Sequence, residues 1–300
     1  GLGAQQASGG LHFLFDTPNA INMQLAVIFG VTSIAVISVM RGLDGGVKLL
    51  SNINMMLALF LLLFVIVAGP TLLIITGFAT TAVDYVSNII PLSNWIGRED
   101  DTWFHGWTVF YWAWWISWSP FVGMFIARIS KGRTVREFIT AVLLVPTIIT
   151  IIWMSTFGGT GLAQAVNGVG ELSNGIGDVS LAFFQMLENL PWSGIISFMA
   201  ITLVLVFFVT SSDSGSLVID SITAGGKLDA PVPQRVFWAV MEGVIAGALL
   251  YGGGKEALKA LQSGSVATGL PFTFVLLLMC VSLYMGLSAE SKRLKSLKAT

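Results

Sequence analysis

Long apolar runs separated by short polar turns restrict the fold of this chain more than any other feature. A helix needs about 20 consecutive apolar residues to cross the hydrocarbon core of a bilayer. Runs of this kind predict membrane-spanning helices at about residues 20–40, 55–78, 102–129, 138–157, 192–212, 237–251 and 268–287, after a partial span at residues 1–15. The sequence therefore predicts an all-α polytopic membrane protein.

Composition supports the same class. Apolar residues make up 55% of the chain and charged residues 10%, whereas a soluble domain carries about a quarter charged residues. The net charge of −1 and the absence of a basic stripe argue against a nucleic-acid partner. Cys280 is the only cysteine, and His12 and His105 are the only histidines. We therefore expect no disulfide within the chain and no transition-metal site.

The segments between the runs have distinct characters. Residues 81–101 interleave apolar residues with Asp84, Asn88 and Asn94, which predicts a helix lying in the membrane interface. A short amphipathic helix is predicted near residues 179–188, and a polar loop at residues 213–234. Because the chain opens inside apolar sequence at Gly1, we expect it to be a fragment that lacks upstream helices.

Loop charges predict the orientation of the spans, because cytoplasmic loops carry an excess of Lys and Arg. Basic residues occupy alternate connections, at Arg41 and Lys48, at Arg128, Lys131, Arg133 and Arg136, at Lys227 and Arg235, and in the tail from Lys292 to Lys298. Lys255 and Lys259, on the opposite side, are exceptions. The pattern places the C-terminus and the tail at residues 289–300 in the cytoplasm.

The strongest local motif is the aromatic run from Phe110 to Phe121. Trp112, Trp114, Trp115 and Trp118 fall within two helical turns near the middle of their span. An interfacial belt would place them at a span end, and ordinary packing between membrane helices favours small residues. A quaternary ammonium group has no N–H to donate, so electron-rich ring faces are the means of holding it. The run predicts a cation–π cage in which Trp115 and Trp118 are best placed.

The same residues carry a family resemblance. The run from Trp112 to Ile129, with the Gly132-Arg133-Thr134 turn after it, resembles the signature of the betaine/choline/carnitine transporter family. Supporting matches lie at Gly1-Leu2-Gly3-Ala4-Gln5-Gln6, Gly42-Leu43-Asp44-Gly45-Gly46, Gly69-Pro70-Thr71 and Thr210-Ser211-Ser212-Asp213-Ser214. The resemblance covers nearly the whole chain.

The resemblance implies an inverted-repeat (LeuT-like) transporter fold and a homotrimer. Residues 1–80 would end the first repeat, residues 81–101 would form the connector, and residues 102–288 would form a complete second repeat. It places Trp115 in a central aromatic box, and Trp118 with Phe125 lower on the cytoplasmic path. Arg128 matches an arginine at the inner end of that path, although a role as a positive-inside anchor is an equal alternative.

A candidate sodium site lies at residues 207–214. Sodium is a hard ion that takes oxygen ligands, and the Phe207 carbonyl and the Thr210 and Ser211 hydroxyls fall about one helical turn apart. Such hydroxyls also bond back to the carbonyl one turn earlier, so this motif alone leaves both readings open. The resemblance favours sodium, and it implies a second sodium site beside Phe121.

Two acidic residues, Asp213 and Glu242, occur within or next to the predicted membrane spans. An acid within a membrane segment is a functional candidate by default. Asp213, however, is predicted at the cytoplasmic end of a helix, where a local helix-end or loop hydrogen bond is the favoured interpretation. Glu242 is predicted to stand alone.

Together these features predict a secondary transporter that imports a quaternary-ammonium compound of the glycine betaine or choline type into a bacterium across its inner membrane. Sodium-coupled symport by alternating access is the favoured mechanism, with no cofactor besides the coupling ion. Sodium-independent exchange, as in a carnitine antiporter, is the alternative. A membrane enzyme acting on a choline-type headgroup is a distant third, because no acid/base pair or metal cluster accompanies the tryptophans.

Overall fold

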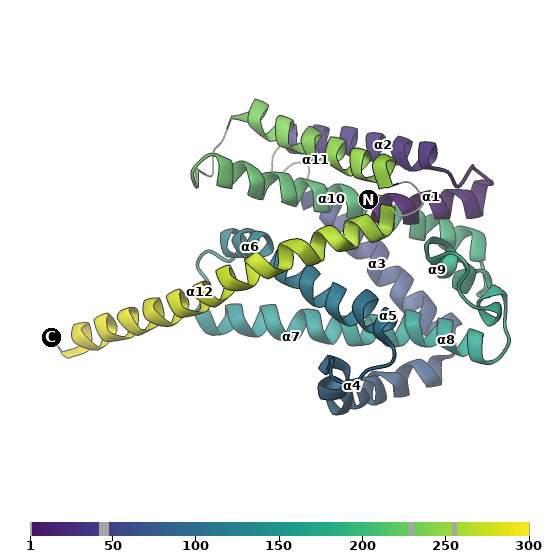
Figure 1. Ribbon diagram of the computed structural model, residues 1–300, viewed down its shortest axis with the longest axis horizontal. Helices are drawn as coiled ribbons and strands as arrows, with labels where there is room; N and C mark the ends of the chain where they lie inside the picture. Colours follow the sequence, from purple (N-terminus) through teal and green to yellow (C-terminus); the bar gives the residue numbers. More distant parts are fainter. Residues whose placement is uncertain (1, 42–47, 228–230, 254–256, 300) are drawn as a thin grey trace. The chain divides into compact units, whose positions relative to one another are not determined.

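The computed structural model describes residues 2–41, 48–227, 231–253 and 257–299 (Figure 1). Every regular element in these ranges is helical, which confirms the all-α prediction. The helices are α1 Leu2–Phe15, α2 Ile21–Arg41, α3 Lys48–Ala68, α4 Thr71–Ser93, α5 Asp101–Phe104, η2 His105–Val109, α6 Phe110–Ile129, α7 Val135–Trp153, η3 Met154–Gly158, α8 Gly159–Val166, η4 Glu171–Asn174, α9 Val179–Glu188, α10 Ser193–Thr223, α11 Val232–Gly253 and α12 Ala257–Ala299.

Seven helical segments in the described ranges are long and apolar enough to cross a membrane. They lie at Ile21–Met40, Lys48–Ala68, Thr71–Ser93, Val135–Val166, Ser193–Thr223, Val232–Gly253 and Gln262–Leu297. The aromatic helix α6 is not among them, because its Trp, Tyr, Ser and Pro residues lower its mean hydropathy. The chain is an all-α polytopic membrane protein.

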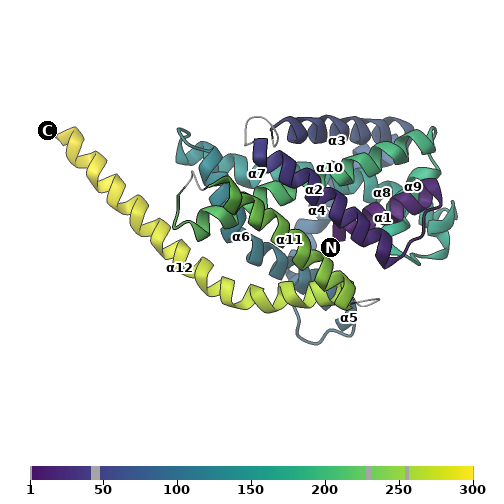
Figure 2. The same cartoon turned by 90° about the horizontal axis from the view of Figure 1, so that it is seen from above.

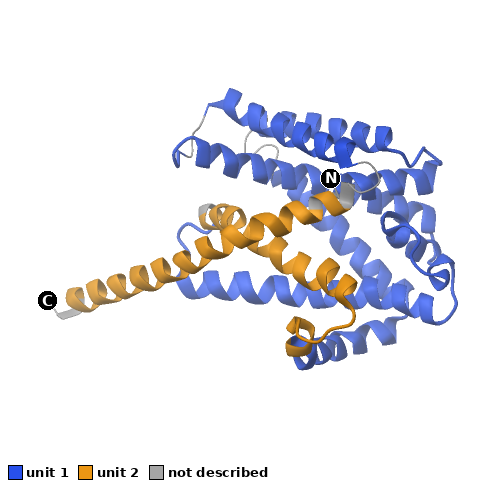
Figure 3. Cartoon of the chain, in the orientation of Figure 1, with its two compact units in different colours: residues 1–89, 130–258 blue, residues 90–129, 259–300 orange. Residues whose placement is uncertain are grey.

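The chain divides into two compact units, shown in Figure 3. Unit 1 comprises residues 1–89 and 130–258, and unit 2 comprises residues 90–129 and 259–300. This division by packing differs from the predicted repeat boundaries, which stay a prediction.

Helix α10 is the centre of unit 1. It packs against α1, α2, α3, α9 and α11 (Figures 1 and 2). One apolar cluster joins α10 to α1, α2 and α11 through residues such as Ala7, Val31 and Val209. A second joins α10 to α3 and α9 through residues such as Val65, Phe184 and Ile201. These neighbours bury much of the apolar surface of α10, while Ile195, Phe198 and Phe207 stay exposed.

Helices α2 and α11 approach closely through glycine. Gly243 and Gly247 form a Gly-x-x-x-Gly pair on α11, and such pairs let membrane helices pack at short range. A Cβ at Gly243 would overlap the Thr32 side chain of α2, and one at Gly247 would contact Leu25 at 3.6 Å. The pair therefore lies on the face of α11 that meets α2.

Gly243→Ala is expected to destabilise the protein by about 1–3 kcal/mol, the usual cost of overpacking a close contact. Thr32 is β-branched and has few alternative rotamers in a helix, so it yields poorly. The measurement is thermal unfolding of the detergent-solubilised protein. Gly252→Ala is the matched control, because a Cβ there meets no atom within 4 Å. Equal melting temperatures for the two variants would contradict the close approach.

The predicted span at residues 55–78 is wrong as a single helix. Helix α3 ends at Ala68 and α4 begins at Thr71. Pro70 has no N–H to continue the hydrogen-bond ladder, and it disfavours helical geometry at Gly69. The Thr71 hydroxyl donates to the Ile66 carbonyl at 2.7 Å, which satisfies an acceptor at the break. The predicted interfacial helix consequently starts ten residues earlier than expected and ends at Ser93.

Several other helices extend beyond their predicted spans. The run that starts at Val135 continues through η3 and α8 to Val166, α11 begins at Val232, and α12 covers Ala257–Ala299. Helix α9 has the predicted bounds, and α2 matches within one residue. The predicted polar loop at residues 213–234 is wrong over its first half, because α10 continues unbroken to Thr223. Leu217, Val218 and Ser221 in this extension are buried, so packing against neighbouring helices outweighs the local polarity.

Unit 2 contains the helical path from Asp101 to Ile129, together with most of α12. Helix α6 contacts α12 through the Ser117 hydroxyl, which donates to the Ser265 carbonyl at 3.0 Å. Phe121 packs edge-to-face on Phe272, with ring centroids 5.8 Å apart. A Cβ at Gly269 would lie 3.1 Å from that of Ala113. These contacts define one face of α6 as its packing face within the unit.

An arginine orders the segment that precedes α5. Arg98 pairs with Asp100 at 2.7 Å and donates to the Pro91 carbonyl at 2.9 Å. Its guanidinium also lies 4.7 Å from the ring centroid of Phe104. Hydrogen bonds from Arg98 hold the pKa of the Asp100 carboxyl below its usual range.

This pair predicts a small pH dependence of stability. Because the Asp100 pKa is lower in the folded state, the pair contributes stability above the ordinary aspartate pKa of about 4 and loses it as the pH falls through the folded value. Asp100→Asn should therefore lower the melting temperature slightly at pH 7. The difference should vanish in acid, and a difference independent of pH would refute the assignment.

Candidate functional site

The predicted cage residues lie on α6, and the helix groups them as expected. Tyr111, Trp115, Trp118 and Phe125 recur at spacings of three, four and seven residues on one face of the helix formed by Phe110–Ile129. This face differs from the one that Ala113, Ser117 and Phe121 present to α12.

The four tryptophans have different surroundings. Trp114 stacks on Phe110 at 5.6 Å and lies 5.7 Å from Tyr111, so it belongs to an aromatic cluster within its own helix. Trp112, Trp115 and Trp118 make no ring contact among the described residues and are 56%, 69% and 45% exposed. The described chain thus presents three indoles with free faces, and it does not bring any two of them into contact.

The helix before the tryptophans widens by one residue. Residues His105–Val109 form a π-helical turn between α5 and α6. Within it Trp107 stacks almost parallel on Tyr111, with centroids 5.9 Å apart. Such π-turns inside helices are frequent at functional sites. The turn sets the angular position of the whole aromatic face.

The predicted sodium ligands lie midway along α10, in unit 1. The Thr210 hydroxyl donates to the Phe207 carbonyl at 3.0 Å, so these two oxygens converge as the spacing predicted. The same bond is the back-bond that a hydroxyl in an apolar helix makes without any ion. Ser211 follows on the next position and is half-buried. Phe121, predicted beside a second sodium site, lies in unit 2.

Several predicted features lie outside the described residues. They include the side chains of Arg41 and Arg128, the motif Gly42-Leu43-Asp44-Gly45-Gly46, Gly1 and Lys255. Phe125, the other predicted residue of the cytoplasmic path, is half-buried on α6.

The prediction that Asp213 makes a local helix-end or loop hydrogen bond is wrong. Asp213 lies well inside α10, is fully buried, and accepts a 2.6 Å hydrogen bond from Ser38 of α2. Glu242 of α11 likewise does not stand alone, because the Ser212 hydroxyl donates to it at 3.0 Å. The signal for this cluster was the presence of two acids in apolar segments. Their partners come from other helices, so sequence spacing could not supply them.

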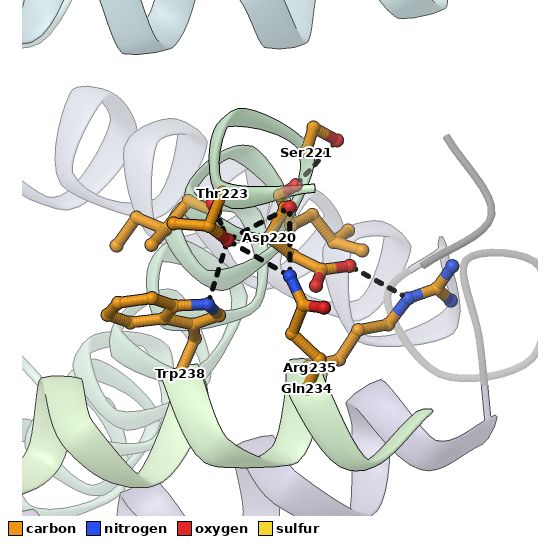
Figure 4. A network of polar contacts seen from close by, with 8 residues as sticks. Asp220, Ser221, Thr223, Gln234, Arg235 and Trp238 are labelled. Atoms are coloured by element: carbon orange, nitrogen blue, oxygen red, sulfur yellow. Dashed lines mark hydrogen bonds and ion pairs between the residues drawn. The ribbon is translucent and has the colours of Figure 1, made fainter. Parts of the chain in front are cut away.

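A polar network joins the end of α10 to the start of α11 (Figure 4). Arg235 pairs with the buried Asp220 at 3.2 Å, and Gln234 and Trp238 both donate to the Thr223 hydroxyl at 3.0 Å. A carboxylate that is 3% exposed is costly unless it is paired. The network therefore fixes how α11 leaves the turn after α10.

Comparison with known proteins decides the family. The family model of the betaine/carnitine/choline transporters matches residues 1–292. The chain belongs to this family. Because the family is one of transporters, the enzyme alternative is set aside.

Several relatives are closely similar. The chain is 64% identical over 291 residues to glycine betaine transporter 1 of Vibrio parahaemolyticus, covering 97% of this chain and 55% of that protein. It is 64% identical over 292 residues to the glycine betaine/proline/choline/ectoine transporter of the same organism, covering 97% of this chain and 52% of that protein. The glycine betaine transporter of Bacillus subtilis is 42% identical to the chain over 298 residues, covering 98% of this chain and 57% of that protein. The chain spans about half the length of the curated relatives it matches.

Proposed function

We propose that this chain is part of a secondary transporter that imports a quaternary-ammonium compound, with glycine betaine as its first candidate substrate. Family membership supplies the class of protein. The names of the similar Vibrio and Bacillus proteins, all of which include glycine betaine, support the substrate class.

The observation that carries the substrate proposal is the aromatic face of α6. Trp112, Trp115 and Trp118 follow one another at intervals of three residues, and they expose indole faces that no described ring covers. A desolvated cation–π contact contributes about 2 kcal/mol. Two or three such contacts hold a trimethylammonium group that offers no hydrogen-bond donor. Trp114, which packs on Phe110 and Tyr111, would support the ring arrangement or contribute one further face.

We propose sodium coupling at the Phe207 carbonyl and the Thr210 and Ser211 hydroxyls, with Phe121 near a second ion. Convergence of the Thr210 and Phe207 oxygens supports this proposal. Sodium binding would favour one state of an alternating-access cycle only by its difference in affinity for the two states. Phe125 and Arg128 would line the cytoplasmic exit.

The wider assignments follow from the family resemblance. They are an inverted-repeat (LeuT-like) fold with substrate near the midplane, a homotrimer in a bacterial inner membrane, and a cytoplasmic C-terminus. The positive-inside distribution of Lys and Arg supports the orientation.

The test is uptake of radiolabelled glycine betaine and choline by the full-length transporter that contains this chain, reconstituted in proteoliposomes. An inward sodium gradient is compared with an equal gradient of N-methyl-D-glucamine. Saturable, sodium-driven uptake is expected. Saturable uptake without sodium dependence would support the exchange alternative, and no uptake of either compound would overturn the proposal.

A further inference from the structure

A seam of mostly small residues holds the aromatic helix α6 against α12 within unit 2. We call this contact the α6–α12 seam. Its members on α6 are Ala113, Ser117 and Phe121, and its members on α12 are Ser265, Thr268, Gly269 and Phe272. Residues three or four positions apart lie on one face of a helix, so each set forms a single stripe.

The two backbones come closest at Gly269. A Cβ at this position would lie 3.1 Å from the Cβ of Ala113, 3.2 Å from its Cα and 3.3 Å from its carbonyl oxygen. Gly269 and Ala113 are both buried. Small residues allow membrane helices to approach this closely. The glycine therefore fixes the distance between α6 and α12 at one point, and a larger residue there has to displace one of the helices.

Hydroxyl groups fix the rotation of α6 beside that point. The Ser117 hydroxyl donates across the seam to the Ser265 carbonyl at 3.0 Å, and its oxygen lies 3.1 Å from the Thr268 hydroxyl oxygen. The Ala113 carbonyl, 2.8 Å from the Ser117 oxygen, is a second acceptor within α6. Because hydrogen bonds have a preferred length and direction, a turn of α6 about its axis stretches or bends the bonds to α12.

The aromatic face of α6 turns with the helix. Trp112, Trp115 and Trp118 make no ring contact among the described residues, so stacking on other rings does not hold them there. Helical side chains lie about 5–6 Å from the axis, and a turn of about 10° therefore moves them by about 1 Å. A cation–π contact needs the cation within about 6 Å of the ring centroid. Several such contacts to one cation therefore require α6 to keep its rotation.

We propose that Gly269 and Ser117 are positioning residues for the aromatic face: the α6–α12 seam sets the rotation of α6 and thereby the affinity for the quaternary-ammonium substrate. Each residue acts through the contact between the two helices and does not touch the substrate. This role rests on the proposed function, and it adds α12 to the parts of the chain that determine substrate affinity.

The test is glycine betaine uptake by the full-length transporter that contains this chain, measured in proteoliposomes as initial rates over a range of betaine concentrations. Gly269→Ala is expected to raise the concentration for half-maximal uptake about 10-fold, since a misplacement of about 1 Å costs a binding site up to about 100-fold. The maximal rate should change less. Gly264→Ala is the matched control on the same helix, because a Cβ there meets no atom within 4 Å.

A second substitution separates positioning from a general loss of stability. Ala113→Gly removes the Cβ that a side chain at position 269 would meet first, so Ala113→Gly/Gly269→Ala should return the half-maximal concentration toward the native value. Glycine weakens a helix interior, and a defect caused by instability would therefore deepen in the double variant. Ser117→Ala adds no atom and removes the bonds across the seam. It should raise the half-maximal concentration less than Gly269→Ala, and it keeps the test decisive if Gly269→Ala fails to fold.

The outcomes distinguish this role from the proposed function. Saturable native uptake with an unchanged half-maximal concentration in both Gly269→Ala and Ser117→Ala overturns the positioning role and leaves the transport function standing. A Gly269→Ala defect that Ala113→Gly deepens or leaves unchanged also overturns it. No saturable uptake by the unsubstituted protein overturns the proposed function, and the positioning role falls with it.

Discussion

Trp115→Ala is expected to raise the glycine betaine concentration for half-maximal uptake about 30-fold. Loss of one desolvated cation–π contact removes about 2 kcal/mol of binding energy, and each 1.4 kcal/mol corresponds to a factor of ten. The indole is 69% exposed and touches no described ring, so its removal should disturb packing little. The measurement is initial-rate uptake in proteoliposomes across a range of betaine concentrations.

Two further variants sharpen this prediction. Trp115→Phe retains an aromatic face of lower electron density. Its glycine betaine concentration for half-maximal uptake should therefore lie between those of the native protein and Trp115→Ala. Trp95→Ala removes an indole that is 73% exposed outside the α6 face and should leave uptake unchanged. Equal affinity in Trp115→Ala and Trp95→Ala would remove Trp115 from the cage.

Apolar length and periodicity carried most of the fold prediction, because helices that cross a bilayer have a minimum length. These two features predicted the bounds of α9 fully and those of α2 to within one residue. The break at Gly69-Pro70 also had a sequence signal, since Pro70 cannot continue a helix, yet the apolar run across it was given more weight than the proline. The missing N–H of Pro70 ends the helix there even though the surrounding residues are apolar.

The extension of α10 beyond Ser212 had a weaker signal. Ser211-Ser212-Asp213-Ser214 is polar enough to suggest a helix end, and these residue types compete with helix through local hydrogen bonds. In the fold Asp213 finds Ser38, which is 175 residues away along the chain. A donor on a distant helix made the polar segment compatible with burial, and no local rule could anticipate it.

The candidate site was predictable to the same degree. Spacing alone placed Trp115, Trp118 and Phe125 on one face, and it brought the Thr210 hydroxyl to the Phe207 carbonyl. Spacing could not reveal that Trp114 packs within its own helix, since the neighbours of a ring depend on rotamers. The cluster around Asp213 and Glu242 depends on contacts among three helices and was missed for that reason.

The double variant Thr210→Ala/Ser211→Ala is expected to raise the sodium concentration for half-maximal uptake about 10- to 100-fold, since an oxygen that bonds a charged group contributes about 1.5–3 kcal/mol. The competing reading is that Thr210 only bonds back to Phe207. Thr202→Ala tests that reading, because Thr202 makes the same kind of back-bond to the Phe198 carbonyl at 2.9 Å on the same helix.

If back-bonding were the whole role of Thr210, the two helix positions would behave alike. Both would leave sodium activation unchanged and alter stability by similar small amounts. A raised sodium requirement in Thr210→Ala/Ser211→Ala with normal activation in Thr202→Ala would therefore assign the difference to an ion. Unchanged activation in both, with betaine uptake intact, would instead favour sodium-independent exchange on the same aromatic face.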